Sequence, residues 1–378
     1  MVHSLCVVSS ITLQYIANIR LPTEKAHGAQ IMKTCEALAR AGARVVLVVP
    51  ARRTQIIDDP FGYYAVEKVF SIVRLPVVDL IYFGRIGFWL ESLSFSIFEL
   101  IYALTHRASV YYSREDLPLY ILSFFKKNIV WESHGGRINF LVRRILQVSD
   151  KMVVITNGIK NFYEKNNIRV KTLVAPDGID LKSFADPESK DKARVRLGLP
   201  LDRKVALYIG RLDGWKGADT LFEAAAFLPT DIIVAMIGGE EKQIDKLKKQ
   251  YPSVRFLGFH PYRELADNQA AADVLVLPNT GKDEVSALFT SPMKLFSYMA
   301  AERPIVASNL PSLREVLSEE SAQFFTPDDP RSLAEAIQKV CADPSRAEKL
   351  AAKARADVVH YTWEERAKSI LAFIQHTT

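Results

Sequence analysis

The sequence is poor in the residues that build disulfide frameworks and structural zinc sites. Only three of its 378 residues are cysteine, Cys6, Cys35 and Cys341, and they lie far apart with no CxxC pair. The histidine closest to any of them is His3, a lone neighbour of Cys6. A reducing compartment such as the cytoplasm is therefore expected, and a disulfide framework or a structural zinc site is not.

Long uninterrupted apolar runs are also missing. The longest candidates, 77–90 and 93–104, are broken or bounded by charged residues, so neither reaches the roughly 18 to 20 residues that span a bilayer. Residues 1–12 are mildly apolar but have no basic n-region and no convincing cleavage site, so a signal peptide is not expected. These absences predict a soluble chain.

The composition that remains is globular. The chain is 49% hydrophobic and 24% charged, with 17 Gly and 18 Pro. Disorder would need fewer apolar residues, and a collagen-like chain would need far more glycine. A length of 378 residues exceeds one ordinary hydrophobic core and suits two domains of roughly 150 to 200 residues each.

The net charge of +6 is unevenly placed. Residues 1–175 hold 22 Lys+Arg and 13 Asp+Glu, whereas the remainder holds 27 and 30. A basic first half suggests contact with something anionic, such as a membrane surface or a phosphorylated lipid, or simply a basic surface. Nucleic acid is the rival partner, but the chain has no zinc finger, RNP-like motif or arginine-rich arm, so nucleic-acid binding is not expected.

Short apolar runs alternate with helical patterns along almost the whole chain, which is typical of strand–helix–strand units and a parallel sheet. In the first half we expect a helix at 29–41 and strands at 13–17, 44–49, 110–112, 129–132, 152–155 and 171–174. In the second half we expect strands at 205–209, 232–237, 254–257, 274–277 and 305–307, and helices at 218–227, 241–250, 263–271 and 292–301. The predicted fold class is α/β, with two doubly wound Rossmann-like domains facing each other across a cleft.

A change in composition marks the predicted domain boundary. Residues 176–192 are rich in Asp, Pro and Ser and are expected to form a linker. The first domain then covers 1–175 and the second 193–359.

The segment Gly210-Arg211-Leu212-Asp213-Gly214-Trp215-Lys216-Gly217 follows a buried strand and precedes a helix. Its glycines allow backbone N–H groups to approach a ligand, and the helix start adds partial positive charge. Arg211 can fork onto phosphate oxygens, and Lys216 offers a point charge. The pattern predicts an anion site suited to a diphosphate. The alternative is a strand–turn–helix with solvated cations.

A second helix start is expected within 289–300. Ser291 is a good cap and Pro292 suits the first helical turn. Lys294 would lie in that first turn, where the helix dipole disfavours a cation unless an anion is bound. The alternative is an ordinary exposed lysine.

These motifs occur in a characteristic order. GRLDGWKG is followed by IGG at 237–239, FLGFHPYRELADNQAAADVLVLPN and SPMKLFSYMAAERPIVASNLPSLREVL, and preceded by RLPTEKAHGAQIMKTCEALARAGARVVLVVP, VVITNGIKNFY and APDGID. From about Leu13 to the terminal YTWEERA, the sequence resembles a family 4 glycosyltransferase (glycosyl transferases group 1) with the GT-B fold. In such a fold the helix at about 360–378 packs back on the first domain.

The resemblance implies a retaining transferase that uses a nucleotide-diphosphate sugar, UDP- or GDP-linked. The acceptor would be a glycan or a lipid-linked molecule in surface polysaccharide or glycolipid synthesis. Arg211 and Lys216 would hold the leaving diphosphate, the base would lie near 258–262, and His134 of WESHGG would touch the transferred sugar unless it is an ordinary loop residue. The implied donor-binding residues are Gly28, Gly210, Gly238, Phe259, His260, Ser291, Pro292, Met293, Lys294 and Ser297.

The mechanism implied by the resemblance needs neither a metal nor another cofactor. The departing phosphate can take the acceptor's proton on the same face, so catalysis depends on neutralising the diphosphate and orienting two substrates. Arg and Lys would do the neutralising. Consistently, the sequence has no Asp-x-Asp triplet, which metal-dependent sugar transferases of the other major fold usually carry.

Three positions depart from the family pattern. The family typically has two glutamates eight positions apart, and here those positions are Phe289 and Ser297. A carboxylate accepts hydrogen bonds from both ribose hydroxyls, whereas Ser297 can make only part of that contact. Glu302 stands where the helix usually ends in glycine, so it must adopt the left-handed conformation or end the helix differently. The alternative function is a catalytically silent homologue that binds a glycan or a partner subunit.

The region 83–104 is rich in Phe, Trp, Leu and Ile, and it contains or precedes Arg85, Arg107, Lys126 and Lys127. Aromatic and basic residues together favour a membrane interface. This predicts peripheral contact of the first domain with the inner face of a membrane. The alternative is a helix pair buried in the core.

Overall fold

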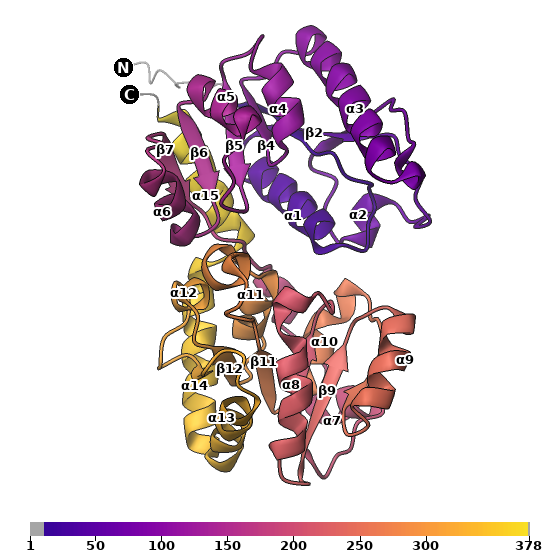
Figure 1. Cartoon of the computed structure of the whole chain (residues 1–378), viewed down its shortest axis with the longest axis vertical. Helices are drawn as coiled ribbons and strands as arrows, with labels where there is room; N and C mark the ends of the chain where they lie inside the picture. The colour runs from indigo at the N-terminus through magenta and orange to yellow at the C-terminus, as the bar shows by residue number, and fades with distance from the viewer. Residues whose placement is uncertain (1–10, 377–378) are drawn as a thin grey trace, which may run out of the picture. The chain divides into compact units, whose positions relative to one another are not determined.

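The computed structural model describes residues 11–376, so Cys6, His3 and the segment considered for a signal peptide lie outside the described residues, apart from positions 11 and 12. The described chain forms two compact units (Figure 1). The first comprises residues 11–154, 162–175 and 363 onward, and the second comprises 155–161 and 176–362.

The first unit is built on a sheet of seven parallel strands in the order β3-β2-β1-β4-β5-β6-β7. The strands are β1 Thr12–Ile16, β2 Arg44–Pro50, β3 Ser71–Leu75, β4 Val110–Ser113, β5 Ile129–Ser133, β6 Lys151–Val154 and β7 Lys171–Val174. The strand order reverses between β1 and β4. Ligands of such sheets bind beyond the carboxyl ends of the strands at this switch point.

The helices of the first unit include one that comes from the end of the chain. They are α1 Ala26–Arg40, α2 Pro60–Tyr63, α3 Arg85–Thr105, α4 Asp116–Leu122, α5 Phe140–Val148 and α15 Trp363–Gln375. Helix α6 (Asn157–Lys165) is divided between the two units. The buried residues Trp363, Ala367, Ile370 and Ile374 recur at helical spacing on α15, which packs against α1.

The second unit is built on six parallel strands in the order β10-β9-β8-β11-β12-β13. They are β8 Lys204–Ile209, β9 Ile232–Ile237, β10 Arg255–Phe256, β11 Val274–Leu277, β12 Ile305–Ser308 and β13 Gln323–Phe325. Alternate residues of β8 enter different core clusters, Leu207 on one face and Tyr208 on the other. Both faces are buried, which explains the near-continuous apolar strand sequences. The switch point of this sheet lies between β8 and β11.

Helices cover both faces of the second sheet. They are α7 Lys190–Leu197, α8 Ala218–Ala224, α9 Glu241–Gln250, α10 Leu265–Ala270, α11 Met293–Ala300, α12 Pro311–Arg314, α13 Pro330–Ala342 and α14 Pro344–Asp357. Residues of α7, α10 and α11 belong to one core cluster, and residues of α8, α9 and α13 belong to the other. The segment 176–192 holds a 3₁₀ turn, Leu181–Phe184, whose Phe184 is buried in the core of this unit.

The predicted alternation of strands and helices is confirmed, with boundaries that differ by a few residues. The helix expected at 29–41 begins at Ala26, so Gly28 lies inside a helix and not in a loop. Strands β3 and β13 were not predicted. Both are edge strands with several partly exposed residues, so neither shows a continuous apolar run.

Candidate functional site

Two cations meet at one carboxylate beyond the end of β8. Nη2 of Arg211 lies 3.2 Å from Oδ1 of Asp213, and Nζ of Lys216 lies 2.9 Å from Oδ2 of the same residue. Burial opposes the ionisation of Asp213, but Lys216, Arg211 and Lys294 outweigh it and lower the pKa of this carboxyl. Asp213 therefore forms an ion pair with both Arg211 and Lys216. Its single negative charge is smaller than their combined positive charge.

Lys294, in the first turn of α11, reaches the same loop. Its Nζ donates to the hydroxyl of Tyr208 at 2.9 Å and lies 4.1 Å from the centre of that ring. The Tyr208 hydroxyl in turn donates to the carbonyl oxygen of Arg211 at 3.0 Å. Burial, with a smaller contribution from Lys216, holds the pKa of Lys294 well below its usual range, against the attraction of Asp213. Lys294 is therefore not an ordinary exposed lysine, and three basic side chains meet here.

Two of the predicted glycines lie where the backbone of this site is crowded. A Cβ on Gly210 would lie 3.0 Å from Nζ of Lys294 and 2.8 Å from the Tyr208 hydroxyl. A Cβ on Gly238 would lie 2.2 Å from the carbonyl oxygen of Gly210, and the φ of Gly238 is +116°. The absence of side chains at both positions lets the ends of β8 and β9 approach Lys294.

The loop after β10 joins this site through its backbone. The N–H of Gly238 donates to the carbonyl oxygen of Gly258 at 2.7 Å. Phe259 is 64% exposed, and Nδ1 of His260 lies 3.0 Å from a carboxylate oxygen of Glu264. Phe259 and His260 thus lie on a loop anchored to the β9 end, as exposed or partly exposed groups.

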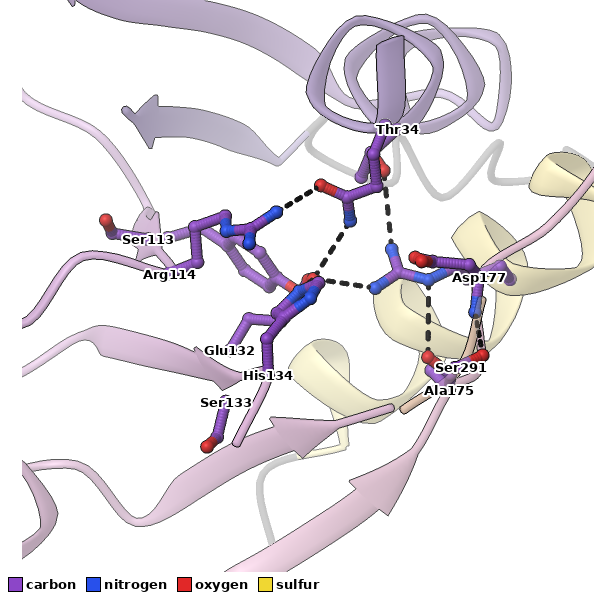
Figure 2. A network of polar contacts seen from close by, with 12 residues as sticks. Thr34, Ser113, Arg114, Glu132, Ser133, His134, Ala175, Asp177 and Ser291 are labelled. Carbon is purple, nitrogen blue, oxygen red and sulfur yellow. Dashed lines mark hydrogen bonds and ion pairs between the residues drawn. The ribbon is translucent and has the colours of Figure 1, made fainter. Parts of the chain in front are cut away.

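The start of α11 differs from the expectation. Pro292 is the N-cap and Met293 the first helical residue, and no side chain caps the helix. The hydroxyl of Ser291 accepts the backbone N–H of Asp177 at 3.2 Å instead of capping the helix (Figure 2). Pro292 was expected at the first helical position, so the helix begins one residue later than expected. The first N–H groups of α11 are consequently left without a side-chain partner from the cap, which suits a bound anion.

Ser297 lies in the core of the second unit, where protein groups occupy its hydroxyl. The side chain is buried, and its hydroxyl donates to the carbonyl oxygen of Lys294 at 3.0 Å while accepting from Nε2 of Gln269 at 2.9 Å. Its short side chain is satisfied inside the core. Phe289 is buried as well. Glu302 adopts the left-handed conformation, with φ +54°.

Gly28 is also placed differently from the expectation. A Cβ there would lie 2.2 Å from the hydroxyl of Tyr64 and 2.7 Å from Cγ2 of Thr23. Helix α1 begins three residues earlier than predicted, so Gly28 lies in its first turn. There it faces Tyr64 and Thr23, and these side chains fill the space beside it. The packing of Tyr64 therefore leaves no room for a side chain at position 28.

In the first unit, His134 follows β5 and is tied to a buried carboxylate (Figure 2). Its Nε2 lies 2.5 Å from Oε1 of Glu132. The same oxygen accepts a hydrogen bond from Nε2 of Gln30 at 3.2 Å and forms an ion pair with Nη2 of Arg366 at 2.9 Å. The hydroxyl of Tyr112 donates to the other carboxylate oxygen. Burial opposes the ionisation of Glu132, but Arg366, His134 and Tyr112 outweigh it and hold its pKa well below the usual range. His134 is therefore a member of a polar network and not an ordinary loop residue.

Sequence reasoning missed Glu132, Arg366, Gln30 and Arg114, whose Nη1 donates to Oε1 of Gln30 at 2.9 Å. One signal was available for the first of these. Glu132 interrupts the apolar strand sequence IVWES, and a charged residue in a strand buried on both faces must find a partner. The partner, 234 positions further along the chain, could not be identified from spacing.

The second unit also contains a cavity that lies away from the cation cluster. A cavity of about 860 Å³ lies at the amino edge of the second sheet, lined by residues such as Lys204, Arg303 and Arg355, and it shares no residue with the cation cluster. Within residues 11–376, no three His, Cys, Asp or Glu side chains are grouped to hold a metal ion.

Helix α3 carries most of its large apolar residues on the outside, although Phe95 and Ala103 are buried. Its buried residues include Glu91, Ser92, Ser96 and Glu99. Its exposed large apolar residues are Ile86, Phe88, Trp89, Leu90, Leu93, Ile97, Phe98, Ile101 and Leu104. Arg85 and Thr105, at the two ends of the helix, are exposed as well. The alternative of a helix pair buried in the core is therefore wrong for this face. By length and composition alone α3 could also cross a membrane, which the search for uninterrupted apolar runs did not predict because Glu91 and Glu99 break the run.

The second unit resembles a known protein family. Residues 189–357 match the family described as glycosyl transferases group 1. A D-inositol 3-phosphate glycosyltransferase of Xylanimonas cellulosilytica is 31% identical over 218 residues, covering 52% of this chain and 49% of that protein. The chain spans about half the length of the curated relatives it matches.

Two solved structures resemble the described chain over nearly all of its length. Sucrose-phosphate synthase from Thermosynechococcus elongatus has a TM-score of 0.76 at 22% identity, covering 96% of this chain and 98% of that one. Anabaena Alr3699/HepE, in complex with UDP and glucose, has a TM-score of 0.76 at 16% identity with the same coverage. The expected GT-B fold is confirmed by these two structures. The match to the glycosyl transferases group 1 family covers the second unit.

Proposed function

We propose that this chain transfers a sugar from a nucleotide-diphosphate sugar to a glycan or lipid-linked acceptor, with retention of the anomeric configuration and without a metal ion. We place the reaction in the cytoplasm, at the inner face of a membrane. The observation that carries the proposal is the meeting of Arg211, Lys216 and Lys294 at the carboxyl end of β8, beside the switch point of the second sheet.

The cation cluster suits a leaving diphosphate. Asp213 pairs with both Arg211 and Lys216, and a diphosphate would compete with it for the same N–H groups. Arg211 offers planar forked donors and is about half exposed, so it is available to phosphate oxygens. Fixed cations and the first N–H groups of α11 would stabilise the negative charge that develops as the sugar leaves. The leaving phosphate would accept the acceptor's proton on the same face.

In this proposal His134 donates or accepts a hydrogen bond at a hydroxyl of the transferred sugar. The nucleotide is UDP or GDP, and UDP is the first choice to test because the similar HepE structure is described with UDP and glucose. The relative named D-inositol 3-phosphate glycosyltransferase acts, by that name, on a phosphorylated polyol. An anionic acceptor, such as a lipid-linked one, would suit the basic first half of this chain.

The decisive experiment pairs nucleotide binding with transfer. UDP-, GDP- and ADP-sugars are tested for thermal stabilisation and for nucleotide release with the full chain. The double variant Arg211→Ala/Lys216→Ala should keep its fold and lose on the order of 100-fold or more in transfer, because two charge-assisted contacts are removed. A matched control, Lys246→Ala/Lys249→Ala, removes two exposed cations of α9 in the same unit and should not matter. Full transfer by the first variant would contradict the proposal.

A second candidate function is a catalytically silent GT-B homologue that serves as a glycan- or partner-binding subunit. The interior positions of Phe289 and Ser297 favour it, because neither offers the carboxylate that the family uses for the ribose. The same nucleotide panel separates the two. A silent homologue would gain no stability from any nucleotide, whereas an active transferase would gain stability from the nucleotide of its donor.

We also propose that the outer face of α3 rests on a membrane. A helix packed on a sheet normally buries its apolar side, and α3 instead buries Glu91 and Glu99 while exposing Trp89 and Ile97. An exposed apolar face of this kind suits an apolar phase better than water. The nearby Lys126 and Lys127 follow α4, which packs against α3, and would favour anionic lipid.

A further inference from the structure

We propose that Arg366, on the returning helix α15, is a positioning residue that fixes the ring of His134 through Glu132. The last helix of the chain would then be part of the sugar-side site. The proposal rests on the proposed function for the role of His134 in transfer, but its first test below needs no substrate.

The guanidinium of Arg366 joins three separate segments of the first unit. Its Nη2 lies 2.9 Å from Oε1 of Glu132, its Nε donates to the carbonyl oxygen of Ala175 at 3.3 Å, and its Nη1 donates to the hydroxyl of Thr34 at 3.5 Å (Figure 2). Only 3% of its side chain is exposed. A side chain held this way has little freedom, so it presents its charge to Glu132 in a fixed direction.

Arg366 keeps Glu132 ionised. The carboxylate is fully buried, and burial alone would favour the protonated form. An ionised carboxylate only accepts hydrogen bonds, so the Nε2 of His134 at 2.5 Å must carry the proton and donate. A protonated Glu132 would carry a donor of its own and would no longer define which ring nitrogen faces it.

This arrangement sets the chemistry of the His134 ring. With Nε2–H donated to Glu132, the neutral ring has its lone pair on Nδ1, which can accept from a sugar hydroxyl. The carboxylate also stabilises the protonated ring, in which both nitrogens donate. Ring orientation and proton affinity therefore both depend on a charge that lies on helix α15.

Packing alone does not require an arginine at this position. Helix α15 is already held by the buried side chains of Trp363, Ala367, Ile370, Leu371 and Ile374. A whole buried ion pair is a weak stabiliser compared with well-packed apolar residues, but methionine at position 366 alone would leave the buried Glu132 without its cation. What methionine cannot supply is the charge that faces Glu132.

Other ionisable groups act on Glu132 without changing charge near neutral pH. Tyr15 on β1, Tyr112 on β4 and Cys35 on α1 are buried, which raises the pKa of each. Arg114, which bonds Gln30, remains a cation.

The first test is nuclear magnetic resonance of the free full-length chain with ¹⁵N-labelled histidine, the His134 signals being assigned from a His134→Gln spectrum. The wild type should show a downfield, slowly exchanging Nε2–H proton on His134. Arg366→Met should lose it, and Arg366→Lys, which keeps a charge, should restore part of it. Glu132→Gln should lower the titration midpoint of His134 by about one pH unit, because the attracting anion is gone.

The control lies on the same helix. Lys368 is exposed and pairs with Glu364 and Glu365, so Lys368→Met removes a cation of α15 without touching Glu132. Its His134 signals should match the wild type. Unchanged His134 signals in a folded Arg366→Met protein would overturn the proposal. If that variant does not fold, Arg366→Lys and Glu132→Gln decide it by the same signals.

The second test is kinetic. With the sugar donor that supports transfer, Arg366→Met should lower kcat about 10-fold or more with little change in the KM of the donor, and Arg366→Lys should recover part of the loss. Normal kcat in Arg366→Met would overturn the role in transfer. A chain that transfers no sugar at all would defeat the proposed function, while the magnetic resonance result would still decide whether Arg366 positions His134.

Discussion

Lys294 lies in the first turn of α11, where the helix dipole opposes a cation, and burial lowers its pKa. The unfolded chain therefore binds this proton more readily, and stability is lost as pH falls from the ordinary lysine range towards the lowered value. Lys294→Met should remove that loss and raise the melting temperature near neutral pH by roughly 2–4 °C, since about 1 kcal/mol has that effect in a domain of this size. The same variant should bind nucleoside diphosphate at least 10-fold more weakly.

Thermal unfolding followed across pH, together with calorimetric titration of UDP or GDP, checks this prediction. Loss of the amine leaves the Tyr208 hydroxyl bonded to the carbonyl oxygen of Arg211, so no new buried group is left without a partner. Lys242→Met, on the exposed side of α9, serves as the control. A variant that is both less stable and normal in binding would mean that Lys294 is a structural lysine.

Glu302 holds a left-handed backbone, with φ +54°, at a position where a side chain is costly. Glu302→Gly should therefore stabilise the protein by about 0.5–1 kcal/mol in denaturant unfolding. The substitution also removes the ion pair of Glu302 with Arg355 at 3.2 Å, which is exposed and contributes little. Glu302→Ala removes the same ion pair but keeps the Cβ, so it should show no gain. Equal stability of the two variants would rule out backbone strain as the cause.

The outer and inner faces of helix α3 lead to two separate predictions. On the outer face, Ile97→Glu/Ile101→Glu should reduce binding to vesicles that contain anionic lipid by 10-fold or more, because two exposed apolar side chains become charged. Vesicle flotation measures this directly. Leu201→Glu alters an equally exposed apolar residue of the second unit and should leave binding unchanged. If both variants bind alike, the apolar face of α3 is not the contact.

On the inner face of α3, burial raises the pKa of Glu99 to about 8, against a small opposing effect of Lys126. The folded state keeps the proton that the unfolded chain releases near pH 4, so stability should fall as pH rises from about 4 to about 8. Glu99→Gln keeps an acceptor for the Nε2 of Gln14 at 3.0 Å and cannot ionise. We expect it to be more stable than the wild type at about pH 9, and close to it at about pH 5. Chemical unfolding at both pH values provides the comparison, and parallel pH profiles would contradict it.

At the scale of the whole molecule, the two proposed contacts belong to different units. The cation cluster of Arg211, Lys216 and Lys294 lies within 176–362, and α3 lies within 11–154. Each function should therefore survive loss of the other. The Lys294→Met protein should bind vesicles as the wild type does, and the Ile97→Glu/Ile101→Glu protein should keep its affinity for nucleotide. Measuring both affinities on both variants completes the test, and joint loss would indicate general misfolding.

The alternation of apolar strands and amphipathic helices was sufficient to predict two parallel-sheet units, because a strand covered on both faces must be apolar throughout. The loop at 210–217, with its glycines and cations, was predicted for a different reason: its residues are contiguous in sequence. The start of α1 at Ala26 was not, because its first turn holds only small residues and one histidine and so carries no large apolar repeat. The filled space beside Gly28 follows from that shift and from Tyr64, which is distant in sequence.

What the sequence by itself determined is therefore what local physics decides: most of the strands, several of the helices, the loop that presents Arg211 and Lys216, and a lysine poorly placed for its helix dipole. Only the tertiary structure decided which distant groups meet. It buried Ser297 in the core, where its hydroxyl accepts a hydrogen bond from Gln269. It also placed Lys294 in hydrogen-bond contact with Tyr208, and Arg366 of the last helix in an ion pair with Glu132. Burial and pairing of charged groups depend on the positions of all neighbours at once, and residue spacing carries no record of them.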